Sequence, residues 1–128
     1  MSEQLGTKNV RDVSAAFDLL RNARRRGVLY TVNRNGRTSV SELARRIAAW
    51  QSDDHDESAD PMAVETSLVH AHLPKLSEAN AIEYDREEGV VAPTEATADL
   101  APLLARTRER EPELVRAAGT ADLRALEI

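Results

Sequence analysis

The stretch PMAVETSLVHAHLPKLSEANAIEYDREEGVVAP, residues 61–93, decides the fold because it changes from helical spacing to strand alternation. Pro61 suits the first position of a helix, and apolar residues then recur every three or four positions as far as about Ala79. The expected core face of this helix comprises Val69, Leu73 and Leu76, with Val64 and Leu68 on the adjacent flank. Pro74 has no amide hydrogen, so the helix should kink or divide near His72.

A β-hairpin is expected directly after this helix. Asn80 suits the left-handed conformation that closes a helix. Residues 81–85 alternate apolar with acidic side chains, residues 86–89 have a turn composition, and residues 90–92 can return beside them until Pro93 ends the pairing.

Three shorter helices are expected before residue 51. The first begins at Asp12 and should bury Val13, Ala16, Phe17 and Leu20. The second is capped by Asn22 and stopped by residues 33–36. After a short β-prone segment at residues 38–40, Ser41 should cap a third helix with Leu43, Ile47 and Trp50 on one side. The acidic residues 51–60 have no hydrophobic period and predict a solvated loop.

The chain of 128 residues is expected to form one domain over residues 12–107. Its last core helix is capped by Thr94 and contains Leu100, Leu103 and Leu104. Residues 1–11 are expected to form a flexible N-terminus. Residues 108–128 form a charged C-terminal tail, which is either partner-dependent, as a dimerisation or partner-binding helix, or disordered.

Charge is distributed unevenly along the chain. Residues 1–52 carry a net charge of +6 and the remainder −11, which together give the formal net charge of −5. Such asymmetry indicates either a basic face that meets nucleic acid or a fold that neutralises itself internally. Arginine supplies 15 of the 17 basic residues beside an acidic surplus, a pattern typical of a salt-adapted organism.

Composition excludes several classes of protein. No cysteine is present, which rules out disulfides and thiolate zinc sites. No stretch approaches the roughly 20 consecutive apolar residues that a membrane span needs, and the N-terminus has no leader pattern, so a cytoplasmic protein without membrane association is expected.

The segments SVSELA at 39–44 and HLPKLSEANAI at 72–82 resemble the second helix, recognition helix and wing entry of archaeal winged-helix transcription regulators. The closest likeness is to a haloarchaeal group of uncharacterised winged-helix domains with a similar His-Leu-Pro-Lys-Leu run before an acidic hairpin. This resemblance covers roughly residues 14–105. It implies a mainly α fold with a small β-hairpin, a winged helix-turn-helix.

The resemblance also implies an interface for double-stranded DNA. Thr66, Ser67, His70 and Ala71 would face the bases, and Lys75 would reach a phosphate. Further phosphate contacts are expected from Arg37, Arg45, Arg46 and the hairpin tip at Arg86. The expected function is sequence-specific or semi-specific DNA binding by a transcriptional regulator that acts as a homodimer through its terminal helices.

Two features favour a different class of function. The expected recognition helix has no arginine before Pro74, and the hairpin is acidic. The alternative is therefore a winged-helix protein-interaction module that docks a basic partner through its hairpin and C-terminal tail. The residues Arg24, Arg25 and Arg26 form either a solvated helix face paired with the acidic half of the chain or a phosphate contact.

Neither a metal site nor an active site is expected. His70 and His72 point about 200° apart on a helix, so they cannot share an ion. The acidic segment 53–57 lacks the glycine and terminal glutamate of a calcium loop. Because the sequence has no phosphate-binding glycine loop and no nucleophile motif, we expect no enzymatic activity and no cofactor.

Overall fold

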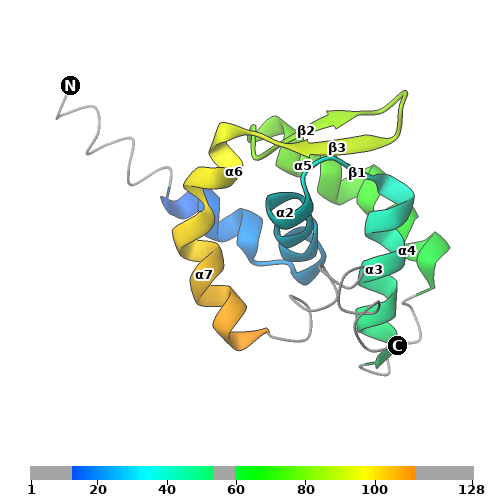
Figure 1. The fold of residues 1–128 in the computed structure, drawn as a ribbon, viewed down its shortest axis with the longest axis horizontal. Helices are drawn as coiled ribbons and strands as arrows, with labels where there is room; N and C mark the ends of the chain where they lie inside the picture. Colours follow the sequence, from blue (N-terminus) through cyan, green and yellow to red (C-terminus); the bar gives the residue numbers. More distant parts are fainter. Residues whose placement is uncertain (1–12, 54–59, 112–128) are drawn as a thin grey trace, which may run out of the picture.

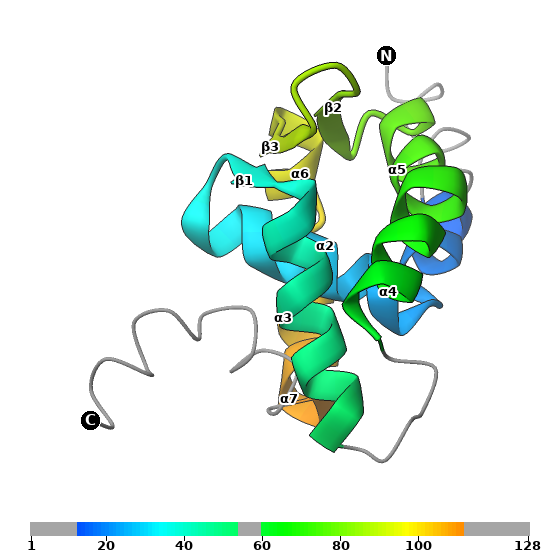
Figure 2. The same ribbon diagram turned by 90° about the vertical axis from the view of Figure 1, so that its right-hand side faces the viewer.

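The computed structural model describes residues 13–53 and 60–111. These residues form a mainly helical domain with one small antiparallel sheet (Figures 1 and 2). A first helix over residues 13–20 precedes the other elements. Those elements are α2 (Ala23–Asn35), β1 (Thr38–Ser39), α3 (Val40–Asp53), α4 (Pro61–Ser67), the π-helical segment η1 (Leu68–His72), α5 (Leu73–Glu78), β2 (Ile82–Asp85), β3 (Val90–Pro93), α6 (Glu95–Asp99) and α7 (Ala101–Arg110).

The sheet joins the predicted hairpin to the short strand between two helices. Its strand order is β1-β3-β2, with Tyr84 opposite Val91 in the hairpin and Thr38 opposite Val91 in the outer pair. The backbone N–H of Val40 donates to the carbonyl of Gly89 at 2.9 Å, which attaches the start of α3 to the hairpin turn. This pairing confirms both strand predictions and sets the hairpin beside the N-terminus of α3.

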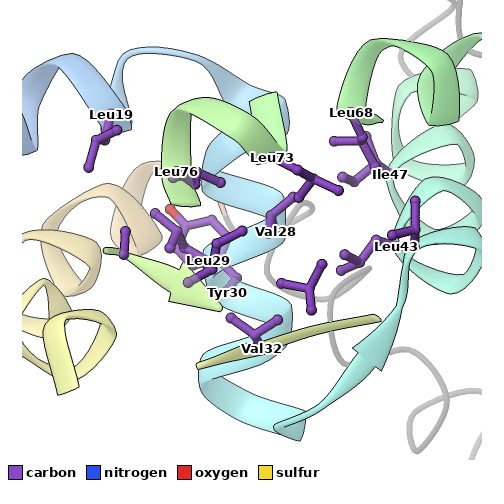
Figure 3. Packing of buried hydrophobic residues seen from close by; sticks show 14 of the residues in the cluster. Leu19, Val28, Leu29, Tyr30, Val32, Leu43, Ile47, Leu68, Leu73 and Leu76 are labelled. Carbon is purple, nitrogen blue, oxygen red and sulfur yellow. The ribbon is translucent and has the colours of Figure 1, made fainter. Parts of the chain in front are cut away.

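The hydrophobic core lies between α2, α3 and the helical segment α4–η1–α5 (Figure 3). Its completely buried side chains come from all of these elements, from β3 and from α7: Val28, Leu29, Val32, Leu43, Ile47, Val64, Leu68, Leu73, Leu76, Val91 and Leu104. Trp50 is partly buried against this cluster, as its spacing on α3 predicts. Truncating one of these side chains typically costs about 2–5 kcal/mol.

The segment η1 explains why the predicted core face of the long helix is only partly correct. Val64, Leu68 and Leu73 are completely buried, whereas Val69, which belonged to the predicted core face, is only partly buried. The N–H of Leu73 donates to the carbonyl of Leu68, five residues earlier. This π turn adds one residue to the helical spacing, so the apolar residues before it and those after it face the same side. Pro74, placed in the first turn of α5, needs no backbone donor there.

Helix ends follow the capping chemistry of the sequence with one exception. Asn22 caps α2 by accepting from Arg24 N–H at 2.8 Å, and Asn80 takes the predicted left-handed conformation with φ of 61°. At α3, the Ser39 hydroxyl accepts from Glu42 N–H at 3.1 Å, so the predicted cap at Ser41 is wrong by two residues. The reason is that α3 already begins at Val40, directly after the strand.

The first helix differs from its prediction in orientation. Ala16, Leu19 and Leu20 are buried, but Val13 and Phe17 are exposed, at 48% and 59% of their maximum. The helix therefore rests on the domain through one face and leaves two apolar side chains, four residues apart, on its outer face. Its expected cap, Asp12, lies outside the described residues.

The last helices are anchored to α2 by polar contacts. Thr94 caps α6 as predicted, and the single helix expected there is divided at Leu100 into α6 and α7. The Tyr30 hydroxyl lies 2.5 Å from Thr107 Oγ1 and donates to Glu111 Oε2 at 2.8 Å. Arg26 Nε donates to Glu111 Oε1 at 2.7 Å, so the described chain ends on a contact with α2.

Candidate nucleic-acid interface

The helical segment α4–η1–α5 has one buried and one outward side. Asp60 caps it by accepting from Ala63 N–H at 3.3 Å, and Val64 and Leu68 hold its inner side against the core. Thr66, His70 and Ala71 are exposed on it, and Ser67 is half-buried. The Thr66 hydroxyl donates to the carbonyl of Met62 at 3.0 Å and keeps its lone pairs available as acceptors.

The two arginines of α3 share one carboxylate. Arg45 donates to Glu42 through Nε at 3.1 Å and Nη2 at 2.6 Å, and Arg46 Nε donates to Glu42 Oε2 at 2.6 Å. Hydrogen bonding from Arg45 and then Arg46 holds the pKa of Glu42 below its ordinary value, against the opposing effect of burial. The Arg45 side chain is 49% exposed, whereas that of Arg46 is 9% exposed. A phosphate contact by Arg46, expected from the sequence, does not fit its burial.

Lys75 also has a carboxylate partner. Its Nζ lies 2.7 Å from Asp18 Oδ2, and both side chains are about 40% exposed, at 42% and 40%. The hydrogen bond from Lys75 is the main cause of a lowered pKa at Asp18. This ion pair links α5 to the first helix, so Lys75 would have to share its charge between Asp18 and a phosphate.

The hairpin presents four exposed carboxylates and one exposed cation. Arg86 stands over the Tyr84 ring, 5.9 Å from its centroid, within cation–π range. Gly89 has a φ of 67°, and its N–H donates to the carbonyl of Asp85 at 2.8 Å, which closes the turn. The exposed carboxylates are those of Glu83, Asp85, Glu87 and Glu88.

Arg37 differs from the α3 arginines. It is exposed immediately before β1, and no described residue offers its guanidinium a hydrogen bond or an ion pair. Arg37 and Arg86 are thus the two predicted contact cations without a carboxylate partner among the described residues.

Neither interpretation of the three consecutive arginines on α2 describes all of them. Arg24 Nε donates to Gln51 Oε1 at 3.0 Å, and Arg26 binds Glu111, which belongs to the acidic half of the chain. Arg25 is only 7% exposed. A solvated face is therefore wrong for Arg25, because its guanidinium binds backbone carbonyls at the end of the first helix.

The described residues contain no group of three or more metal-ligating side chains. The acidic loop expected at residues 51–60 is shorter than predicted, because α3 continues to Asp53; its residues 54–59 lie outside the described part. No described helix has the length and apolarity to cross a bilayer.

The chain matches a known protein family. Residues 17–92 fit the model of the "Domain of unknown function (DUF7344)", which covers the helices α2–α5, strand β2 and all of β3 except Pro93. The chain belongs to this family. No curated protein and no solved structure is similar at a significant level. The DUF7344 match ends at Ala92, so α6 and α7 follow the family domain.

Proposed function

We propose that this DUF7344 domain is a winged helix-turn-helix that binds double-stranded DNA and regulates transcription. The observation that carries the proposal is the outward side of α4 and η1, where Thr66 and His70 are exposed while Val64 and Leu68 hold the helix to the core. Hydroxyl and imidazole groups can hydrogen-bond base edges or phosphates. In this interpretation α4–η1–α5 is the recognition helix and the hairpin is the wing.

The element order supports this assignment. A strand between two helices pairs with the second strand of the hairpin, and the hairpin turn is attached to the start of α3 through Val40 and Gly89. In winged helices the recognition helix, the helix before it and the wing approach DNA together. Figure 2 shows α4 beside α3 and the hairpin strand β2 beside α5.

Charge makes the proposed affinity modest. Arg37 and Arg86 are available to phosphates, while the exposed Arg45 and the half-buried Lys75 are already paired with Glu42 and Asp18. Four cations per chain would give a slope of log affinity against log salt of about −3 to −4. Four exposed carboxylates on the hairpin oppose phosphates, so only the tip at Arg86 can approach the backbone closely.

A polarisation titration with labelled genomic DNA fragments, at low and at cell-like salt, tests the proposal. Arg37→Ala combined with Arg86→Ala should reduce the salt slope by about 2 and weaken all sequences alike. Arg106→Ala, an exposed arginine on α7, is the matched control and should change neither quantity. If the native chain binds DNA no more strongly than it binds an unstructured polyanion, the proposal is overturned.

We also propose that the active form is a homodimer in which the first helix contacts a second copy. That helix buries apolar residues on one side and exposes Val13 and Phe17 on the other, which is unusual for a solvent-facing helix. A two-fold contact would supply two recognition helices to one DNA site. Sedimentation velocity should show a dimer that Phe17→Ser dissociates and Met62→Ser, at another exposed apolar side chain, does not. A native monomer at all concentrations would contradict it.

The exposed carboxylates of the hairpin favour a second candidate function, a protein-interaction module for a basic partner. Its other expected element, the tail 108–128, falls largely outside the described residues. This function would be favoured if the native chain does not bind DNA but does bind a polyarginine peptide. The combined substitution Glu87→Gln and Glu88→Gln should then abolish binding of the peptide.

A further inference from the structure

Arg25 connects three elements through one guanidinium. Its Nε donates to the carbonyl of Leu19 at 2.9 Å and its Nη2 to the carbonyl of Asp18 at 2.8 Å. These carbonyls belong to the last turn of the first helix, where most backbone acceptors lack helical partners; that of Asp18 also accepts from Arg21 N–H at 3.4 Å. The third nitrogen, Nη1, lies 3.3 Å from Nδ1 of His72, the last residue of η1. Through Arg25, α2 therefore contacts both the end of the first helix and the π-helical segment η1.

The contact requires a neutral His72. Arginine nitrogens only donate, so Nδ1 must accept and the ring proton must lie on Nε2. A protonated His72 would turn a donor toward a donor and bring two cations together. His72 is half-buried, and this burial, followed by the charges of Arg25 and Arg24, keeps its pKa below the ordinary value.

The surrounding charges do not offset this repulsion. α2 contributes the cations Arg24 and Arg25, and α5 contributes Lys75, whose ammonium binds the Asp18 carboxylate of the first helix. That carboxylate also lies 3.2 Å from Arg21. The Asp18 carboxylate is therefore shared by Lys75, Arg21 and Arg25, and it is not among the groups that shift the pKa of His72.

We propose that Arg25 is a positioning residue for the outward side of α4 and η1, acting through the unprotonated His72. The proposal rests on the DNA-binding function proposed above and adds its regulation by acid. When His72 is protonated, η1 loses its tie to α2, and the exposed residues Thr66 and His70 lose their fixed orientation. DNA affinity then falls, by about fivefold, the lower end of usual coupling between sites.

The first test measures the junction without DNA, by NMR titration of the histidine side chains in the full chain. His72 should be the Nε2–H tautomer, and its pKa should lie below the ordinary histidine value. Arg25→Gln should raise the pKa of His72 toward that value. A His72 that carries its proton on Nδ1, or whose pKa is not below the ordinary value in the native chain, would overturn the proposal.

The second test measures DNA affinity between pH 8 and pH 5.5. His72→Asn keeps an acceptor near the Nδ1 position but cannot be charged, so it should bind as the native chain does at pH 8 and should lose the decrease on acidification. His70→Asn leaves the contact between Arg25 and His72 in place, so it should keep that decrease. If acid weakens the native chain and His72→Asn equally, Arg25 has no positioning role. If no variant binds DNA at any pH, the proposed function fails while the NMR result still decides the junction.

Discussion

The arginines of α2 and the arginines of α3 look alike in the sequence and differ in what they do. On α2, Arg25 and Arg26 reach residues outside their own helix: the carbonyls of the first helix, and Glu111 after α7. On α3, Arg45 and Arg46 both bind Glu42, one turn away on the same helix. The α2 arginines therefore hold elements together, while the two α3 arginines share one carboxylate of their own helix.

This difference shows that the contacts of an arginine depend more on its position relative to helix ends than on how many positive charges lie beside it in the sequence. Arg25 faces the end of a preceding helix, where unsatisfied carbonyls attract donors. Arg45 and Arg46 follow a glutamate at three and four residues, the spacing that favours an ion pair along one helix. The following variants test whether the contacts of the two groups differ in energy.

The largest effect is expected for Arg25→Ala. It removes the buried donors to the carbonyls of Asp18 and Leu19, and the Asp18 carbonyl keeps the long 3.4 Å hydrogen bond from Arg21 N–H, so the cost should be about 2–4 kcal/mol. Urea unfolding followed by circular dichroism measures this free energy. A loss below about 0.5 kcal/mol, the level of an ordinary surface substitution, would show that Arg25 is dispensable.

A smaller effect is expected from the Tyr30 contact that accompanies Arg26. Burial is the main cause that raises the pKa of Tyr30 to about 12, and the neighbouring Glu111 carboxylate adds to it. Because the folded chain holds the phenolic proton more tightly than the unfolded chain, stability is complete below pH 10 and falls between about pH 10 and 12. The loss is on the order of 2 kcal/mol.

Unfolding experiments at increasing alkaline pH, with Tyr30→Phe as the comparison, measure this loss. Tyr30→Phe has no proton to lose at this position and should show a weaker decline over the same range. An equal decline in both chains would contradict the assignment to Tyr30.

The smallest effects are expected on α3, and they should differ between its two arginines. Arg46→Ala removes a buried guanidinium and should cost about 1–2 kcal/mol. Arg45→Ala removes an exposed ion pair and should cost no more than about 0.5 kcal/mol, while weakening DNA binding. Thermal unfolding of the two single variants separates these outcomes, and equal costs would mean that burial does not distinguish them.

Much of the fold was predictable because it depends on local chemistry. Asn22, Asn80 and Thr94 end or begin helices where the sequence indicates, and the hairpin follows from alternation between residues 81 and 92. Which residues of α4–η1–α5 face the core was not fully predictable from a 3.6-residue period, since the π turn inserts one residue between Leu68 and Leu73. Pro74 was the only local sign that the helix would deviate.

The candidate site was predictable in part. Exposed Thr66 and His70 lie where the helical pattern indicates, and Arg37 is free of described partners. The burial of Arg46 and the contact between Arg25 and His72 were not predictable. The two residues of that contact are separated by 47 positions, and no spacing rule relates side chains from different helices.

The sequence by itself determined where several helices begin or end, which residues pair in the hairpin and how charge divides along the chain, because each depends on neighbours within a few positions. Only the tertiary structure decided which arginines remain available to a partner. That outcome depends on the approach of Asp18, His72 and Glu111 to α2, and such approaches arise from packing of the whole core.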